Sequence, residues 1–289
     1  MLRARALYKA YRGPPVVRNV SLDLAPGRIV GLVGSNGAGK TTTIKMLSGL
    51  VEPSQGTVTL DEEPTLDPEV RRRIGFLPEN SPLYEEETPL SYLRFFASIY
   101  GISNVQAGTR ARELLTRLDL DEEHWERTIG TFSKGMRRKV AIARAVLHDP
   151  DVLIFDEPTS GLDPLTEHDL NGFMTELAEQ GKAILLSAHN LRQVETLCDE
   201  IIIMHNGEVA THGTLDELRG QWGQREYRLL ADHAFTGSHG SGHGHEATFH
   251  DIRALEDALE EVRRAGGMVL EIESLAPQLE DILVATARS

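Results

Sequence analysis

A glycine-rich segment, Gly34–Thr41, carries the clearest chemical signal in this chain of 289 residues. Its sequence, GSNGAGKT, fits the pattern G-x-x-x-x-G-K-[ST] between an expected strand and an expected helix. Glycines let backbone N–H groups curl around an anion, and the following helix directs its positive N-terminus to the same place. Lys40 is expected to reach the β- and γ-phosphates of a nucleotide, and the Thr41 hydroxyl to ligate Mg²⁺. The predicted phosphate-binding residues are Gly34, Ser35, Asn36, Gly37, Ala38, Gly39, Lys40, Thr41 and Thr42.

Two adjacent carboxylates, Asp156 and Glu157, follow the apolar run 152–155. Ligands of a parallel sheet bind at the carboxyl ends of its strands, where these two residues are expected to lie. Asp156 would hold Mg²⁺, and Glu157 would act as the general base for an attacking water. Alone, this pattern is more typical of a strand that enters an acidic turn. Its combination with the glycine-rich segment favours the catalytic interpretation.

The elements that must position these residues form an alternating pattern. Apolar runs at 28–33, 152–155, 183–187 and 201–204 predict buried strands, and 40–47 and 164–180 predict helices. Such alternation predicts an α/β fold with a parallel sheet covered on both faces. Between residues 82 and 147, helical spacing at 89–100, 106–118 and 134–147 predicts a helical subdomain within a first domain of residues 1–220.

The composition changes after residue 220, which predicts a small α+β accessory domain over 221–289. Strands are expected at 226–231, 247–250 and 268–274, and helices at 252–264 and 276–287. The stretch 232–250 is rich in Gly, Ser and His and predicts a flexible loop. Its histidines could bind Zn²⁺, Cu²⁺ or Ni²⁺, but the glycines favour a solvated linker; they are His233, His239, His243, His245 and His250.

Charge and cysteine content restrict the class of partner and the compartment. The chain has 30 Lys and Arg against 44 Asp and Glu, a formal net charge of −14, which argues against a nucleic-acid partner. One cysteine, Cys198, allows no internal disulfide and fits a reducing compartment. No apolar stretch is long enough to cross a bilayer, and the basic first 15 residues lack the apolar core of a signal peptide. We therefore expect a cytoplasmic protein.

Three further motifs and one aromatic residue point to a family. Thr131–Lys139, TFSKGMRRK, is similar to a divergent signature motif, Ser160–Asp163 to a D-loop, and Ser187–Asn190 to a switch-histidine loop. Over residues 2–220 the chain resembles the ATP-binding subunit of an ABC transporter, a P-loop NTPase of the ABC ATPase type. Tyr11 lies where this family places an aromatic that stacks on adenine. The Lys-Gly-Met form of the signature and the short appendage are more similar to subunits that serve ABC-2-type exporters.

The resemblance implies roles for further residues. His189 would sense or stabilise the γ-phosphate, while Ser133 and Gly135 would bind the γ-phosphate of ATP held by an opposing subunit. Asp163 would couple the two sites. These roles require a head-to-tail dimer, expected to be a homodimer because one chain carries all the motifs. The dimer would lie on the inner face of the membrane beside a separate transmembrane permease.

The sequence departs from the family pattern at two places. Glu79 replaces the usual Gln of the loop that contacts Mg²⁺ or water and couples to the permease; it keeps an oxygen ligand and adds charge. Lys134 and Met136 replace the usual Gly and Gln of the signature, while Ser133 and Gly135 are retained. Ser133 also fits an N-cap of the following helix, and both roles are compatible.

The expected function is ATP binding and hydrolysis, with ATP and Mg²⁺ as ligands, that powers transport, in the export direction, through the permease. Membrane helices would dock near Glu79 and residues 82–100. One alternative is a soluble ABC ATPase that acts on nucleic acid or ribosomes, which the charge opposes. Another is a regulatory subunit that binds ATP without hydrolysing it. The presence of Lys40, Asp156, Glu157 and His189 argues against that alternative.

Overall fold

The computed structural model describes residues 1–222, 226–275 and 277–288. Contacts divide the chain into two compact units, Met1–His212 and Gly213–Ser289, which are described separately below. The boundary expected after residue 220 falls inside helix α8 (Leu215–Trp222), so the division comes before that helix instead. No helix in the described parts of the chain combines the length and apolar character needed to cross a membrane.

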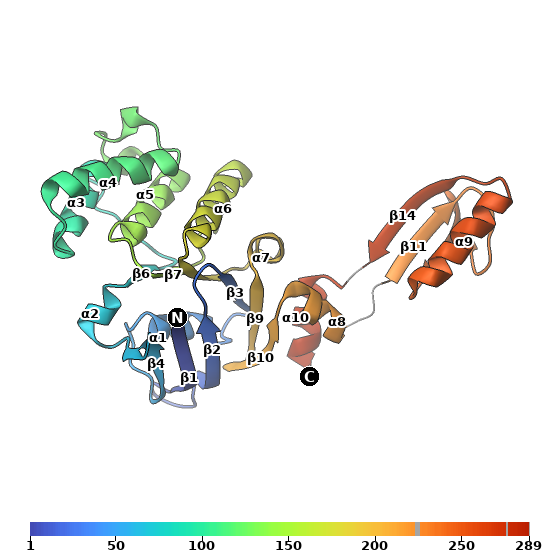
Figure 1. Ribbon diagram of the computed structural model, residues 1–289, viewed down its shortest axis with the longest axis horizontal. Coiled ribbons are helices and arrows are strands. Elements are labelled where there is room, and N and C mark those ends of the chain that lie inside the picture. The colour runs from blue at the N-terminus through green and yellow to red at the C-terminus, as the bar shows by residue number, and fades with distance from the viewer. Residues whose placement is uncertain (223–225, 276, 289) are drawn as a thin grey trace. The chain divides into compact units, whose positions relative to one another are not determined.

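A six-stranded sheet organises the first unit, in the strand order β10-β9-β3-β8-β7-β6 (Figure 1). Adjacent strands from β9 to β6 pair in parallel, which confirms the predicted parallel sheet. Every residue of β3, β7 and β8 is buried, as expected for strands covered on both faces. The strands are β3 (Ile29–Gly34), β6 (Ile74–Leu77), β7 (Val152–Asp156), β8 (Ala183–Ser187), β9 (Glu200–His205) and β10 (Glu208–Gly213).

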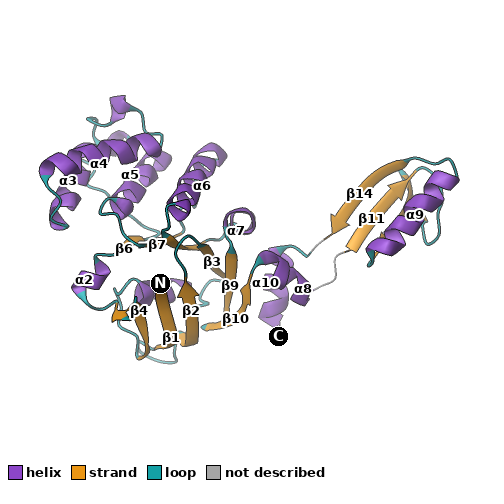
Figure 2. Ribbon diagram, viewed as in Figure 1, coloured by secondary structure: helices purple, strands orange, loops and turns teal. Residues whose placement is uncertain are grey.

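The predicted helices are present, and polar caps define where several of them begin. Side-chain oxygens of Thr88, Ser103, Ser133 and Asp163 accept backbone N–H groups at N-termini. Between β6 and β7 the chain forms helices and no strand (Figure 2). The helices of this unit are α1 (Lys40–Leu47), α2 (Pro68–Arg71), α3 (Pro89–Ile99), α4 (Asn104–Arg117), α5 (Lys134–Val146), α6 (Pro164–Glu179) and α7 (Leu191–Leu197).

A second, antiparallel sheet was not predicted. It has the order β2-β1-β4-β5, with β1 (Leu2–Lys9), β2 (Val17–Leu24), β4 (Gln55–Leu60) and β5 (Glu63–Pro64). Ala6 and Asn19 have positive φ angles of 47° and 52°, and the register of β1 shifts between Ala4 and Leu7. These irregularities interrupt the alternation of buried and exposed residues by which a strand is recognised. The sheet shares one hydrophobic core with α1 and the six-stranded sheet.

The second unit contains a four-stranded antiparallel sheet of order β12-β13-β11-β14, with α9 packed on one face. The prediction of a flexible loop over 232–250 is wrong, because β12 and the whole of β13 lie inside it. The strand expected at 247–250 forms only the end of β13. His245, Ala247 and Phe249 alternate on β13 and pair with Ala231, Leu229 and Tyr227 of β11 on the face that α9 covers. The predicted helix start at Ala276 lies outside the described residues. The elements are β11 (Glu226–Ala231), β12 (His239–Ser241), β13 (Gly244–Phe249), α9 (Ile252–Arg264), β14 (Val269–Leu275) and α10 (Leu279–Arg288), with α8 preceding them.

Candidate functional site

A cavity of about 410 Å³ lies at the carboxyl ends of β3, β7 and β8. These strands are neighbours in the parallel sheet, so the residues that follow them meet at one edge. The cavity brings together the glycine-rich loop, both carboxylates, Glu79 and the predicted switch histidine. Its lining residues are Val16, Asn36, Gly37, Ala38, Gly39, Lys40, Thr41, Thr42, Glu79, Asp156, Glu157 and His189.

The glycines of the loop are required by close backbone approaches. A Cβ atom at Gly34 would collide with the carbonyl oxygen of Met204, and one at Gly39 would lie 2.8 Å from that of Val16. Gly37 has open space around it but adopts a φ angle of 82°, which side chains disfavour. Gly34 and Ser35 do not line the cavity; their carbonyl oxygens instead accept hydrogen bonds from Lys40. The loop therefore presents backbone and a cation to the cavity.

Lys40 is only 8% exposed. Its Nζ donates to the carbonyl oxygens of Gly34 and Ser35 at 2.7 and 3.2 Å. Burial lowers the pKa of Lys40, and the nearby charges of Glu157 and Asp156 oppose that effect. An ammonium that is poorly solvated gains strongly from an arriving anion, so this position suits a phosphate.

Asp156 and Glu157 are buried at the end of β7. Asp156 accepts a hydrogen bond from Ser187 Oγ at 2.6 Å, because the two residues are paired between β7 and β8. The backbone N–H of Glu157 donates to the carbonyl oxygen of Ser187 at 3.2 Å. These bonds fix the backbone on both sides of the two carboxylates.

Glu157 combines the features of a general base. Its φ angle of 52° is strained for a non-glycine residue, and His189 Nε2 lies 3.3 Å from its Oε1. Burial raises the pKa of Glu157, while the charge of His189 lowers it. A raised pKa makes the carboxylate a better proton acceptor at neutral pH. Carboxylate oxygens of Asp156 and Glu79, with the Thr41 hydroxyl, are the donors that Mg²⁺ prefers.

Besides Gly34 and Ser35, four predicted site residues do not line this cavity. Tyr11 is 59% exposed and has Lys9 Nζ 5.3 Å from its ring centroid. Ser133 caps α5 by accepting the N–H of Met136 at 3.2 Å, which confirms the predicted N-cap. Gly135 and Asp163 are brought together through Thr166, which hydrogen-bonds to Asp163 and would lie 3.2 Å from a Cβ at Gly135.

These contacts group Ser133, Gly135 and Asp163 at the adjoining N-terminal ends of α5 and α6, which lie side by side (Figure 1). The Lys134 side chain, at one of the two divergent signature positions, lies against Gly161. The structure therefore separates the predicted site residues into a cavity group and a helix-end group.

Arg138 is a residue that sequence reasoning missed. Its guanidinium donates to main-chain carbonyl oxygens in the loops after β6 and β7, the two loops that carry Glu79 and Glu157. Backbone carbonyls leave no trace in a sequence, so only the run of basic residues in TFSKGMRRK could have indicated it.

Three of the five histidines singled out in the second unit pair with separate carboxylates. In the described ranges, no group of three or more His, Cys, Asp or Glu residues could hold a metal ion. The pairs are His233–Asp232 at 2.9 Å, His239–Glu246 at 3.3 Å and His250–Glu226 at 3.2 Å.

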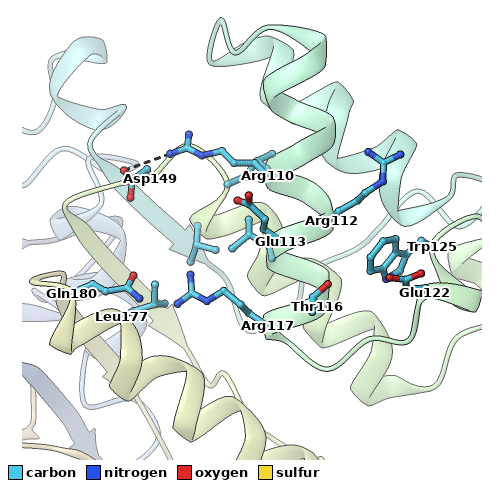
Figure 3. Close-up of a pocket in the computed structure, with 13 residues that line it drawn as sticks. Arg110, Arg112, Glu113, Thr116, Arg117, Glu122, Trp125, Asp149, Leu177 and Gln180 are labelled. Carbon is cyan, nitrogen blue, oxygen red and sulfur yellow. Dashed lines mark ion pairs between the residues drawn. The ribbon is translucent and has the colours of Figure 1, made fainter.

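A larger cavity, of about 680 Å³, lies beside α4, away from these residues. Figure 3 shows the arginines that line it: Arg110 points to Asp149, its ion-pair partner at 3.4 Å. Arg117 pairs with Glu176 at 3.1 Å. Two of the arginines of this cavity are thus paired with acidic residues, and the cavity gathers none of the predicted site residues.

Comparisons with known proteins agree with this geometry. The family model described as "ABC transporter" matches residues 17–160. The chain is 43% identical to the ABC transporter ATP-binding protein NatA of Bacillus subtilis over 205 residues, 70% of this chain and 83% of that protein. It is 38% identical to the Nod factor export ATP-binding protein I of Cupriavidus metallidurans over 220 residues, 75% of this chain and 72% of that protein.

A solved structure shares the fold. It is a dimeric post-hydrolysis state of an ATP-binding cassette bound to ADP and Pi, with a TM-score of 0.68 and 27% identity, and it covers 74% of this chain and 99% of its own. The first unit is accordingly a P-loop NTPase fold of the ABC ATPase type. With the glycine-rich loop, the carboxylate pair and the histidine in one cavity, the chain belongs to the ABC transporter ATP-binding proteins, a family of ATPases that bind ATP.

Proposed function

We propose that this chain binds and hydrolyses ATP as one half of a homodimer and powers export through a separate transmembrane permease. The observation that carries the proposal is the single cavity that holds Lys40, Asp156, Glu157 and His189 at the carboxyl edge of the sheet. A regulatory subunit without hydrolytic activity would not need a buried carboxylate poised as a base.

Each cavity residue has a chemical task in this proposal. Backbone N–H groups of residues 34–42 and the Lys40 ammonium bind the phosphates of ATP. Thr41 and Asp156, with Glu79, would hold Mg²⁺, which neutralises phosphate charge when bound. Glu157 accepts a proton from the attacking water. His189, whose Nε2 lies 3.3 Å from Glu157 Oε1, stabilises the γ-phosphate. Tyr11 would stack on the adenine.

The group at the ends of α5 and α6 supports a dimer. Ser133, Gly135 and Asp163 lie outside the cavity, so they serve the reaction only if a second subunit supplies the ATP that they contact. The fold neighbour described above is itself dimeric. Head-to-tail closure on two ATP molecules would then perform the mechanical work.

An aromatic surface on α3 and the turn before it supports permease docking near Glu79 and residues 82–100. Tyr84, Phe95 and Ile99 are each more than half exposed, and Tyr84 contacts Phe95 with ring centroids 6.2 Å apart. Exposed aromatic clusters of this kind mark protein interfaces. Docking there would hold the chain on the cytoplasmic face of the membrane. Export as the direction is supported by the relative named for Nod factor export.

Two measurements test the proposal. Phosphate release from the purified chain should require ATP and Mg²⁺, and the chain should co-purify from native membranes with a polytopic membrane protein. Hydrolysis without a membrane partner, together with co-purification of ribosomes or nucleic acid, would reject the transport proposal. Tight ATP binding without phosphate release, in the presence of the permease, would reject the ATPase proposal.

A further inference from the structure

The side chain of Arg138 projects from α5 between two loops of the nucleotide site. Its Nη1 donates to the carbonyl oxygens of Pro78 and Glu79 at 3.2 and 3.1 Å. Its Nε donates to Pro158 at 2.7 Å. Its Nη2 donates to Asp156 and Glu157 at 3.0 and 2.5 Å. One side chain thus binds five carbonyl oxygens in two separate runs, residues 78–79 after β6 and residues 156–158 at the end of β7.

Only a guanidinium fits this arrangement. Its five N–H donors lie in one plane and point in fixed directions, whereas a lysine ammonium is a compact point charge with three donors. Burial lowers the pKa of Arg138 to about 10, which leaves the group charged at neutral pH, and the charges of Asp156, Glu157 and Glu79 oppose the burial effect. The cation therefore offsets part of the negative charge gathered at the two loops.

The hydrogen bonds from Arg138 fix the backbone that sets the direction of the Glu157 side chain. A positive φ angle at a non-glycine residue persists only where its surroundings fix it, and Glu157 has a φ of 52°. Arg138 binds the carbonyl of Glu157 and those of both flanking residues, while Ser187 accepts the Glu157 N–H. Arg138 does not itself line the 410 Å³ cavity. It can therefore affect catalysis through geometry without contacting the nucleotide.

We propose that Arg138 is a positioning residue that sets the orientation of Glu157 and Glu79 in the nucleotide cavity. The proposal rests on the ATPase function proposed above. Ser133 caps the N-terminus of α5, the helix that carries Arg138. The guanidinium therefore connects the helix that would meet the opposing subunit's ATP with the loops that face this subunit's own ATP. A movement of α5 on dimer closure is thereby transmitted to the catalytic carboxylate.

The test separates ATP affinity from turnover in the purified full chain. Arg138→Ala should leave the dissociation constant for ATP within a few-fold of wild type and lower kcat by about 10²-fold, the scale of a misplaced catalytic group. The matched control is Arg144→Ala on the same helix, because Arg144 donates to the Tyr92 hydroxyl at 2.9 Å and lies over Phe96 instead. That variant should keep the basal kcat.

Two further measurements distinguish positioning from general loss of structure. Added guanidinium ion should restore part of the kcat of Arg138→Ala and none of any deficit in Arg144→Ala. Arg138→Lys, which keeps charge and helix propensity, should fold like wild type and have a kcat between wild type and Arg138→Ala. A wild-type kcat in folded Arg138→Ala or Arg138→Lys would overturn the proposal, as would an equal loss of ATP affinity and kcat without guanidinium rescue. A wild-type chain that hydrolyses no ATP with its permease would instead reject the ATPase function itself.

Discussion

Burial acts on both charged groups that face each other across the nucleotide cavity. It lowers the pKa of Lys40 and raises that of Glu157, so each ionised form is disfavoured in the folded state. The raised pKa means that folded Glu157 binds a proton more tightly than Glu157 in the unfolded chain. The contribution of this carboxylate to the free energy of unfolding therefore decreases as pH rises. Such a cost is typical of residues kept for chemistry rather than for stability.

Lys40→Ala should nearly abolish ATP binding. The substitution removes the cation expected at the β- and γ-phosphates, and charge-assisted contacts of this kind are among the strongest in such sites. Titration with a fluorescent ATP analogue measures the effect. Lys45→Ala, an exposed lysine one turn further along α1, is the matched control and should bind normally. An unchanged affinity in Lys40→Ala would contradict the assigned phosphate site.

His148 predicts a pH dependence of stability that is independent of the site. Its ring stacks on Tyr100 with centroids 3.9 Å apart, and neither ring nitrogen has a hydrogen-bond partner among the described residues. Burial lowers the pKa of His148 to about 4. Between about pH 6.5 and 4 the unfolded chain therefore binds more protons, so stability falls as pH falls, by about 3 kcal/mol at most from this group.

Urea unfolding at several pH values measures this slope. His148→Phe should flatten it, because the phenyl ring keeps the stacking and removes the titrating group, whereas His168→Phe, at an exposed histidine of α6, should not. Parallel slopes for wild type and His148→Phe would show that another group is responsible.

At the scale of elements, local signals predicted some parts of the fold and failed at others. The observed bounds of α1, β8 and α9 match the predicted ranges, because glycines, caps and apolar periodicity mark their ends in the sequence. The antiparallel sheet was missed where Ala6 and Asn19 interrupt the alternation. The order of the strands, which brings Asp156 beside Ser187, depends on pairing between distant segments and could be anticipated only from the resemblance.

The antiparallel pair β12 and β13 in the second unit was missed because of the composition of this segment. Glycine and histidine suggested a loop, but His245, Ala247 and Phe249 alternate as a strand does. Ala247→Asp should unfold this unit locally at a cost of about 3–5 kcal/mol, because it buries an unpaired charge beneath α9, where Ala247 is 5% exposed.

Hydrogen exchange of the β11 and β13 amides, followed by mass spectrometry, measures that loss. Thr248→Asp is the matched control, because Thr248 is exposed on the opposite face, paired with Arg228. It should leave the amides protected. Equal exchange in both variants and wild type would restore the interpretation of 232–250 as a solvated linker.

At the scale of the whole molecule, the separation of site residues into two groups predicts an ATP-dependent dimer. Glu157→Gln should bind ATP normally and hydrolyse it about 10²–10⁴-fold more slowly, since the amide matches the carboxylate in shape but cannot accept a proton from water. It also removes a negative charge beside the γ-phosphate. ATP with Mg²⁺ should therefore trap this variant as a dimer, which sizing chromatography detects.

The trapped dimer must depend on both groups of residues if the composite site is correct. Adding Lys40→Ala to Glu157→Gln should return the protein to monomer, because the ATP that bridges the subunits is no longer bound. Adding Ser133→Arg should do the same while ATP binding persists, because Ser133 lies outside the cavity and would face only the ATP of the opposing subunit. A Glu157→Gln variant that stays monomeric and hydrolyses ATP at the wild-type rate would show that Glu157 is not the general base. It would also contradict the proposed role of the helix-end group in a dimer. Dimerisation that survives Ser133→Arg would instead place the subunit contact elsewhere on the molecule.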